Sequence, residues 1–424
     1  MRLTAEVLVV GGGIAGTVAA IAAGRAGADT LLVERWGFLG GAATAAAVGQ
    51  FVGWETASGR RVVAGIAEEI VERLVALGAS DGHARFTMST GHVMDRVSYD
   101  PELLKVVLDR LVTEAGVRLL FHTALLDVTR TGETITQVQL LTKAGAVHCA
   151  PRVVVDASGD LDLLARAGCR FLPLGEGETM QPATAMFRFG PVNFAAFNAI
   201  PPDRLKALAA QGVAEGALAR AALHASRVEG TADAWFNIGR VALDATDPLA
   251  LSAAEVEGRR QSLAAAEFLK RQVPGCAAGR LVAFAPQIGI RESRRIAGLH
   301  VLAEAELRTG TAFPDRIAWG AYPIDVHPAR GAGLTFDELG EDHAYAIPLR
   351  SLIPAGLENA IVAGRGISAT HRAHAATRVM PTVMAIGQAA GLAAAMAAQT
   401  NAPPASCDIG ALQAQLRIDG AFLP

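Results

Sequence analysis

The chain begins with apolar residues arranged as a strand, a helix and a second strand. Val7 to Val10 form a continuous apolar run, as expected for a parallel strand buried on both faces. Small and apolar residues then recur at helical spacing from Val18 to Ala23. A second apolar run covers residues 30–33 and ends at Glu34. The pattern predicts a β–α–β unit at the start of the chain.

The next elements are read from amphipathic spacing and from end signals. An apolar stripe predicts a helix over residues 65–77, and Asp100 followed by Pro101 is typical of a helix start. Gly116 ends that second helix. A mixed stretch at 80–98, which holds His83 and His92, reads as a loop and hairpin without a chemical role. Predicted strands follow at 117–121, 124–130, 135–142, 146–149 and 152–156, of which the middle three form a meander.

The pattern changes near Cys169 and returns to alternating strands and helices after Leu352. In between, we expect helices over 202–226 and 248–273, and strands over 184–189, 235–243 and 280–286. A strand at 357–362 then leads to an Ala-rich helix over 380–399. The predicted fold class is α/β: a Rossmann-like domain with a central parallel sheet and a β-meander. Residues 1–168 and 334–424 form this domain, and 169–333 form an inserted α+β substrate domain.

Composition and charge exclude several classes of function. The 424 residues carry a net charge of −3, which gives no footprint for nucleic acid or an anionic membrane. The four cysteines are widely spaced without a C-x-x-C, so we expect no disulfide framework, metal site or redox dithiol. The 380–399 stretch is long enough to span a membrane but contains proline, glycine and glutamine, which favours a buried helix. With no signal peptide in view, a cytoplasmic location is expected.

The first turn carries the sequence G-x-G-x-x-G at Gly11, Gly13 and Gly16. The first glycine permits the tight turn, the second lets the backbone approach a pyrophosphate, and the third lets helix and strand pack closely. The helix N-terminus offers free N–H groups to the phosphates. Glu34 lies 23 residues after Gly11, where a carboxylate accepts hydrogen bonds from a ribose hydroxyl. The sequence therefore predicts FAD or NAD binding; a glycine turn used only for packing is the alternative.

Two further glycine-rich segments are candidates for cofactor contact. Residues 35–44 follow Glu34 and suit a flat ligand, although a flexible loop is the alternative. Asp156 to Asp160 ends a predicted strand, where α/β sheets place ligands. Asp160 is expected to cap the helix over 161–167, alone or together with cofactor contact.

Charged and polar residues gather late in the chain. The stretch 291–295 holds three arginines and one glutamate, which fits either a salt-bridge cluster or an anion site. Tyr322, Asp325 and His327 form a second polar cluster. His371, His374 and Arg378 follow the glycine turn at 364–366.

Taken together, these motifs resemble the bacterial FAD-dependent oxidoreductase family with the glutathione-reductase-type FAD fold, distantly similar to succinate dehydrogenase and fumarate reductase flavoproteins. The resemblance covers nearly the whole chain and rests on VVGGGIAG, ERWGFLGGAAT, YDPELLKVVLD, VVVDASGD, IRESRRIAG, YPIDVH and IVAGRGISATHRAHAATRVMPTVMAIGQAAG. It implies noncovalent FAD, because the segment after the glycine doublet holds no histidine. No second G-x-G-x-x-G follows a strand, so a separate NAD(P)H domain is not expected.

The resemblance also implies which residues bind FAD. The pyrophosphate would lie on the first glycine loop, the ribose on Glu34, and the flavin near Gly40–Thr44 and a helix start near Gln388. The implied cofactor-binding residues are Gly11, Gly13, Ala15, Gly16, Glu34, Arg35, Gly40, Gly41, Ala42, Thr44, Leu125, Ala157, Gly159, Asp160, Gly364, Arg365, Gly387 and Gln388.

The main functional hypothesis is a dehydrogenase or oxidase that moves hydride between a small, anionic organic substrate and flavin N5. His371 and His374 are the first candidates for the base, and His327 is the second, each with a structural role as the alternative. Arg378 and Arg291 are candidates to bind an anionic group. A monooxygenase that uses NAD(P)H and an electron-relay subunit of a larger complex are the competing hypotheses. A homodimer is compatible with the sequence, which names neither the substrate nor the electron acceptor.

Overall fold

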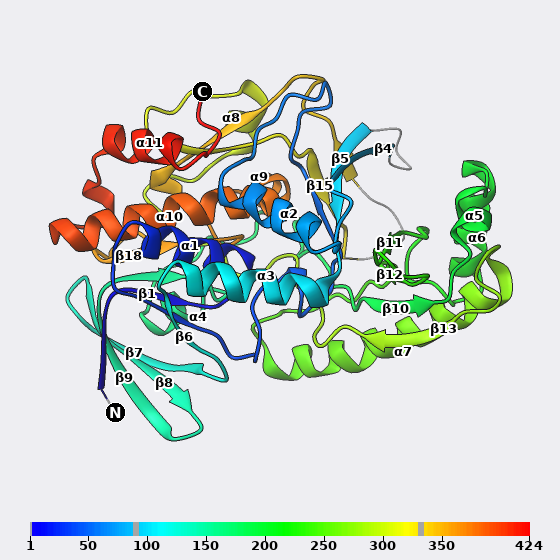
Figure 1. Cartoon of the computed structure of the whole chain (residues 1–424), viewed down its shortest axis with the longest axis horizontal. Coiled ribbons are helices and arrows are strands. Elements are labelled where there is room, and N and C mark those ends of the chain that lie inside the picture. Colours follow the sequence, from blue (N-terminus) through cyan, green and yellow to red (C-terminus); the bar gives the residue numbers. More distant parts are fainter. Residues whose placement is uncertain (1, 88–92, 330–334) are drawn as a thin grey trace.

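A seven-stranded mixed sheet forms the centre of the molecule (Figure 1). The computed structural model describes residues 2–87, 93–329 and 335–424. The strand order is β6-β2-β1-β9-β8-β7, and β18 also pairs with β9. The strands are β1 (Arg2–Val10), β2 (Thr30–Val33), β6 (Arg118–Leu120), β7 (Ala124–Thr131), β8 (Thr134–Thr142), β9 (Gly145–Asp156) and β18 (Ala360–Val362). β6, β2, β1, β9 and β18 run parallel, and β7, β8 and β9 form the antiparallel meander.

The predicted β–α–β start of the chain is confirmed. Val7, Leu8 and Val9 are fully buried in β1, because β2 and β9 lie on either side and helices cover the sheet. α1 (Ile14–Arg25) and α10 (Met380–Thr400) pack on this sheet, and α2 (Ile66–Ala76) and α3 (Pro101–Glu114) lie beside these two helices. α3 begins where predicted, since the Asp100 side chain accepts a hydrogen bond from the N–H of Glu102.

β9 replaces two strands that the sequence predicts as separate. We expected breaks around Pro151, but β9 runs unbroken from Gly145 to Asp156. Its first part pairs with β8 as far as Cys149, and its last part pairs with β18 from Val154 onward. Pro151 therefore lies where one side of β9 has no ladder partner, so its missing N–H costs no hydrogen bond.

A second sheet is antiparallel, with strand order β11-β12-β10-β13. Its strands are β10 (Phe187–Gly190), β11 (Ala225–Arg227), β12 (Ala234–Phe236) and β13 (Arg280–Phe284), with helices α5 (Phe194–Asn198), α6 (Pro202–Ala214) and α7 (Pro248–Gln272). It has its own apolar core around Phe187, Phe236 and Phe268. The helix predicted over 202–226 ends early, because Gly216 takes a positive φ and the chain turns back onto Gly212.

Smaller elements complete the described chain. They are β3 (Gln50–Val52), β4 (His83–Thr87), β5 (Val93–Ser98), α4 (Asp162–Arg166), α8 (Glu304–Thr309), β14 (Arg316–Gly320), β15 (Ile324–Val326), β16 (Thr335–Asp337), β17 (Tyr345–Pro348), α9 (His371–Thr377), α11 (Ile409–Ile418) and three short 3-10 turns, Gly41–Ala43, Leu349–Ser351 and Pro404–Ser406. The predicted hairpin at 80–98 is β4 and β5, which pair antiparallel. His92 and the domain boundary predicted after residue 333 lie outside the described residues.

α10 is the helix that is long and apolar enough to cross a membrane by length and composition. In the structure, 83% of its most apolar window is buried. Gly387 and Gly391 bring it directly against α1, since a Cβ at either position would clash with the carbonyl oxygen of Ala15 or Ala19. Small residues thus place α10 inside the fold, as the sequence predicted.

Candidate functional site

The glycine loop between β1 and α1 is shaped for a close ligand. Gly11 has φ +103° and lies against the backbone of Ala157, and a Cβ on Gly16 would clash with the Gly11 carbonyl oxygen. Gly13 is different: a Cβ there would meet only Gly41, at 4.0 Å. The first N–H groups of α1 have no acceptor within the helix and carry its positive dipole end. The loop therefore leaves open the position at which a pyrophosphate would bind.

Glu34 ends β2 with its carboxylate buried beside the glycine loop. It accepts hydrogen bonds from the N–H of Gly12 at 2.7 Å and from the N–H of Trp36 at 2.9 Å. Burial raises the pKa of Glu34, against the lowering effect of these two N–H donors. The N–H of Thr123 also bonds the Glu34 carbonyl at 3.0 Å, which brings the start of β7 alongside.

The segment after Glu34 folds back over the glycine loop. The N–H of Gly40 donates to Gly12 O at 2.8 Å, and a Cβ on Gly41 would lie 2.8 Å from Gly13 Cα. Thr44 holds the turn by donating to Leu39 O at 2.6 Å. Arg35 points elsewhere, to Gln287 at 2.7 Å.

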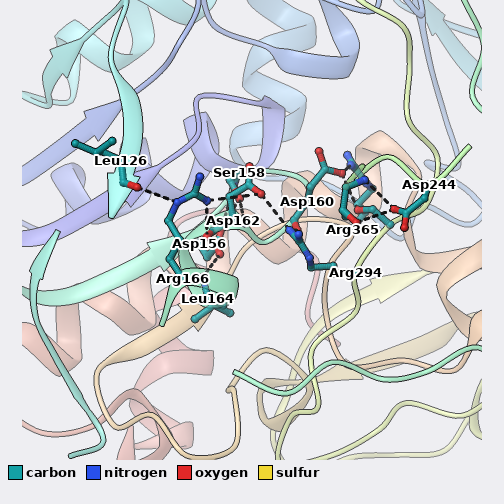
Figure 2. A network of polar contacts seen from close by, with 12 residues as sticks. Leu126, Asp156, Ser158, Asp160, Asp162, Leu164, Arg166, Asp244, Arg294 and Arg365 are labelled. Atoms are coloured by element: carbon teal, nitrogen blue, oxygen red, sulfur yellow. Dashed lines mark hydrogen bonds and ion pairs between the residues drawn. The ribbon is translucent and has the colours of Figure 1, made fainter. Parts of the chain in front are cut away.

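Asp160 has a different role from the helix cap that the sequence predicts. Leu161 occupies the cap position of α4 with φ 56°, and α4 makes no hydrogen bond to the Asp160 side chain. Ser158 and Asp156 accept the first N–H groups of α4 instead. Figure 2 shows Asp160 between Arg365, which pairs with its carboxylate, and Arg294, which donates to its carbonyl oxygen.

A cavity of about 1110 Å³ opens from the glycine loop toward the second sheet. Residues implied in cofactor binding line one part of it: Gly13, Ala15, Ala42, Ala157, Gly159, Gly364 and Arg365. The start of α10 lines it as well, through Met380 and Val383. Residues of the second sheet and of α5 and α6 line the remainder.

Eleven implied cofactor residues are absent from the described lining, and three of these, Leu125, Gly387 and Gln388, lie outside the glycine loop and the segments around it. Leu125 lies in β7, and Gly387 packs against α1. The expected helix start near Gln388 is wrong, because α10 begins at Met380. The Gln388 side chain instead accepts from the N–H of Ile66 at 3.0 Å and so completes the first turn of α2. The sequence missed this because the partner is more than 300 positions away.

Tyr322, Asp325 and His327 meet on the cavity wall. Asp325 Oδ2 accepts from the Tyr322 hydroxyl at 3.2 Å and lies 3.1 Å from His327 Nε2. Burial and then the nearby Arg291 lower the pKa of His327 to about 3. Burial opposes ionisation of Asp325, but the contact with His327 and two arginine charges lower its pKa to about 2. At neutral pH the pair is therefore an ionised carboxylate and a neutral imidazole.

Arg291 and Arg378 line the same part of the cavity. Arg291 donates to Pro182 O at 2.7 Å and to Thr184 Oγ1 at 2.8 Å. Burial, followed by repulsion from Arg378, lowers the pKa of Arg291 to about 9, so it stays charged at neutral pH. Arg378 donates to the Gln181 amide oxygen at 3.3 Å and lies 3.4 Å from Asp325 Oδ2.

His371 and His374 are buried away from the described cavity lining. His371 Nδ1 lies 2.8 Å from Glu292 Oε1, whereas His374 Nδ1 is 4.0 Å from the same oxygen. Burial lowers the pKa of His374 to about 3. The first candidates for the base therefore lie behind the cavity, and the second candidate, His327, lies on its wall.

Sequence reasoning missed two residues of the cavity region. Gln181 is almost completely buried, and its amide oxygen accepts from both the His327 N–H and Arg378. Arg220 follows α6 and lines the cavity. Neither belongs to a sequence motif, because the residues around each come from distant segments. In the 291–295 stretch, Arg291 lines the cavity, and Arg295 lies 3.4 Å from Glu292 in a buried pair, as the salt-bridge interpretation predicts.

The residues around the glycine loop fit an FAD cofactor. The open space at Gly13, the free N-terminus of α1 and the buried Glu34 carboxylate suit a pyrophosphate and its ribose. Arg365 adds a positive charge whose buried Nε has no hydrogen-bond partner in the described part of the chain. In that same part, no three His, Cys, Asp or Glu side chains are grouped to hold a metal ion.

Comparison with known proteins is consistent with this fit. A triple mutant of a flavin-dependent brominase is 14% identical, with a TM-score of 0.50 over 98% of this chain and 84% of that one. A geranylgeranyl bacteriochlorophyll reductase-like protein from Thermoplasma acidophilum is 13% identical, with a TM-score of 0.49 over 99% and 84% of the two chains. No curated protein matches the chain. The family model for FAD dependent oxidoreductase matches residues 6–416, and the chain therefore belongs to that family of FAD-dependent enzymes.

Proposed function

We propose that the chain is a dehydrogenase or oxidase for a small organic anion. The observation that carries the proposal is the polar group of His327, Asp325, Arg291 and Arg378, which shares one cavity with the glycine loop. In this proposal, FAD would supply the acceptor or donor of the hydride when it is bound. The protein supplies binding, orientation and a place for the proton.

Arg291 and Arg378 bind the anionic group of the substrate in this proposal. Guanidinium groups suit carboxylates because two parallel N–H bonds reach two oxygens. Asp325 lies near both arginines and keeps them oriented, together with Gln181 and Thr184. An anion adds to this arrangement without displacing these contacts.

His327 takes or gives the substrate proton. Asp325 receives its Nε2–H, and Nδ1 makes no hydrogen bond to any residue that the structure describes. The positive charge of Arg291 contributes to the lowered pKa of His327. An anionic substrate offsets that charge and raises the imidazole pKa toward neutrality, where a general base is most effective. Substrate binding thus prepares the base.

We also propose that the main sheet belongs to a Rossmann-like FAD domain made of residues 1–168 and 334–424, with 169–333 as an inserted substrate domain. Support comes from β18, which returns late in the chain to pair with β9, and from the separate apolar core of the second sheet. The arrangement gives the cofactor and the substrate different walls of one cavity.

The test is anaerobic reduction of the bound flavin by a panel of organic acids, followed by stopped flow. With an acid that bleaches the flavin, His327→Gln is expected to slow reduction by about a hundredfold or more at unchanged FAD content. His371→Gln and the distant His148→Gln serve as matched controls and keep rates within a few fold. Loss of reduction in His371→Gln with normal rates in His327→Gln would reverse the assignment.

A further inference from the structure

The lining of the cavity carries an excess of positive charge. Seven of the described residues that line the cavity are Arg or Lys, and two, Glu229 and Asp325, are acidic. Arg220 lies near Arg291 and Asp325, and its side chain makes no hydrogen bond or ion pair with any residue that the structure describes. A half-buried guanidinium without a partner is costly unless a ligand supplies one. Arg220 therefore extends the anion site beyond the pair proposed above.

The outer part of the cavity is apolar. Phe194 and Phe197 of α5, together with Ile200 and Leu205, line it. All four side chains are half-buried. One side of each packs on the apolar core of the second sheet, and each side chain also lines the cavity. Phe197 is fixed by edge contact with Phe236, with ring centroids 6.3 Å apart. α5 and α6 thus form an apolar wall beside the basic cluster, at the end of the molecule away from α11 (Figure 1).

We infer that the substrate is an amphipathic carboxylate, with its acid group on Arg220, Arg291 and Arg378 and its hydrocarbon part against α5 and α6. The inference rests on the proposed function and adds the substrate class. A small hydrophilic acid would leave the apolar wall in contact with water. A neutral apolar molecule would leave Arg220 and Arg291 without an ion-pair partner among the residues that the structure describes, and Arg378 with Asp325 alone. An amphipathic acid satisfies both parts of the cavity at once.

A series of ligands measures the contributions of the basic cluster and of the apolar wall to binding separately. Calorimetric titration of the FAD-loaded protein with butyrate, hexanoate, octanoate and decanoate is expected to show affinity rising about fourfold per methylene, from the transfer free energy of a buried CH₂. Octanamide, which has the same length without the charge, is expected to bind at least tenfold more weakly than octanoate. Equal affinity along the series, or equal affinity for octanoate and octanamide, would overturn the inference.

Two pairs of variants locate the contacts. Arg220→Gln is expected to weaken octanoate at least tenfold and octanamide less than twofold, whereas Arg204→Gln, on the exposed side of α6, changes neither. Phe197→Ala is expected to reduce the gain per methylene, and Phe284→Ala, on the partly exposed face of β13, leaves it unchanged. Unchanged binding in both Arg220→Gln and Phe197→Ala would place the ligand elsewhere.

The two proposals fail in different ways. Amphipathic acids that bind as described but never bleach the flavin would disprove the proposed reaction and leave the ligand class standing. Acids that bleach the flavin at rates and affinities independent of chain length would disprove the ligand class and leave the reaction standing.

Discussion

At the scale of single residues, Asp160 shows how distant partners decide a role. An acid just before a helix is a common cap, and the sequence predicted that role for Asp160, alone or together with cofactor contact. In the structure, Arg365 and Ser293 donate hydrogen bonds to the Asp160 carboxylate, and both residues lie more than 100 positions later in the chain. Gln181 was missed for the same reason, and Arg220 was missed because the cavity that it lines is formed by distant segments. By contrast, Gly11 and Gly16 were predicted because the spacing of the glycines marks the turn within a few residues of chain, although Ala157 also packs against both.

Asp160 yields a prediction at this scale. Asp160→Asn removes the charge that faces Arg365 and leaves a half-buried guanidinium without its counterion. The free energy of unfolding of the FAD-free protein is expected to fall by about 1–3 kcal/mol. Urea denaturation measures it, with Asp203→Asn on exposed α6 as the control that leaves stability unchanged. Equal stability of both variants would show that the Arg365 contact contributes nothing.

His374 yields a prediction about pH. Its pKa is about 3 in the folded protein and 6.5 in a model compound, so between these values the unfolded chain binds a proton that the folded protein does not. Stability is therefore full above pH 6.5 and falls as the pH drops. From pH 7 to pH 5, this one group is expected to remove about 2 kcal/mol. Urea midpoints at both pH values should show a smaller loss in His374→Gln than in the parent; the same loss in both would contradict the assignment.

At the scale of elements, the sequence predicted helix starts correctly from local end signals, but it did not predict how far a strand extends when that depends on distant partner strands. α7 begins at Pro248 as predicted, because Asp247 and the proline define its start without help from other segments. β9 was divided in the prediction, because Pro151 normally argues against a strand interior. That position is acceptable only because β8 ends and β18 begins beside it, which the local pattern does not contain.

The contact between α1 and α10 gives the prediction for this scale. Gly391→Ala places a methyl group on the carbonyl oxygen of Ala19, so the two helices must separate. The free energy of unfolding is expected to fall by about 1–3 kcal/mol, as for overpacked cores. Gly410→Ala is the matched control: it lies exposed in α11, and it is expected to gain up to about 1 kcal/mol from helix propensity. Thermal unfolding of both variants measures the two effects. A Gly391→Ala variant as stable as the parent would mean that α1 and α10 are not closely packed at this point.

At the scale of the whole molecule, one cavity joins the main sheet to the second sheet. The sequence predicted both the glycine loop and the polar stretch 322–327, but their meeting depends on how the two sheets are placed. The positions of the histidines depend on that placement as well. His371 and His374 are close in sequence to the glycine turn at 364–366, yet they pack toward Glu292, while His327 reaches the cavity from β15.

Because residues of both sheets line the cavity, binding of FAD is expected to stabilise both sheets against unfolding. FAD at about a hundred times its dissociation constant is expected to add about 2.7 kcal/mol to the free energy of unfolding. Hydrogen exchange measured on peptides from β1 and β10 should slow in both, because the cofactor site and the second sheet unfold together. Slower exchange in β1 alone would show that the second sheet unfolds on its own.

The glycines of α10 have one further consequence, for the reading of sequence variation. Gly387 and Gly391 are absent from the described cavity lining, yet they set the distance at which α10 supports α1 and hence the loop that begins at Gly11. Natural variation should therefore be as restricted at these two positions as at the glycines of the loop itself. A conservation profile would mark them like cofactor ligands, although their function is to hold one helix against another.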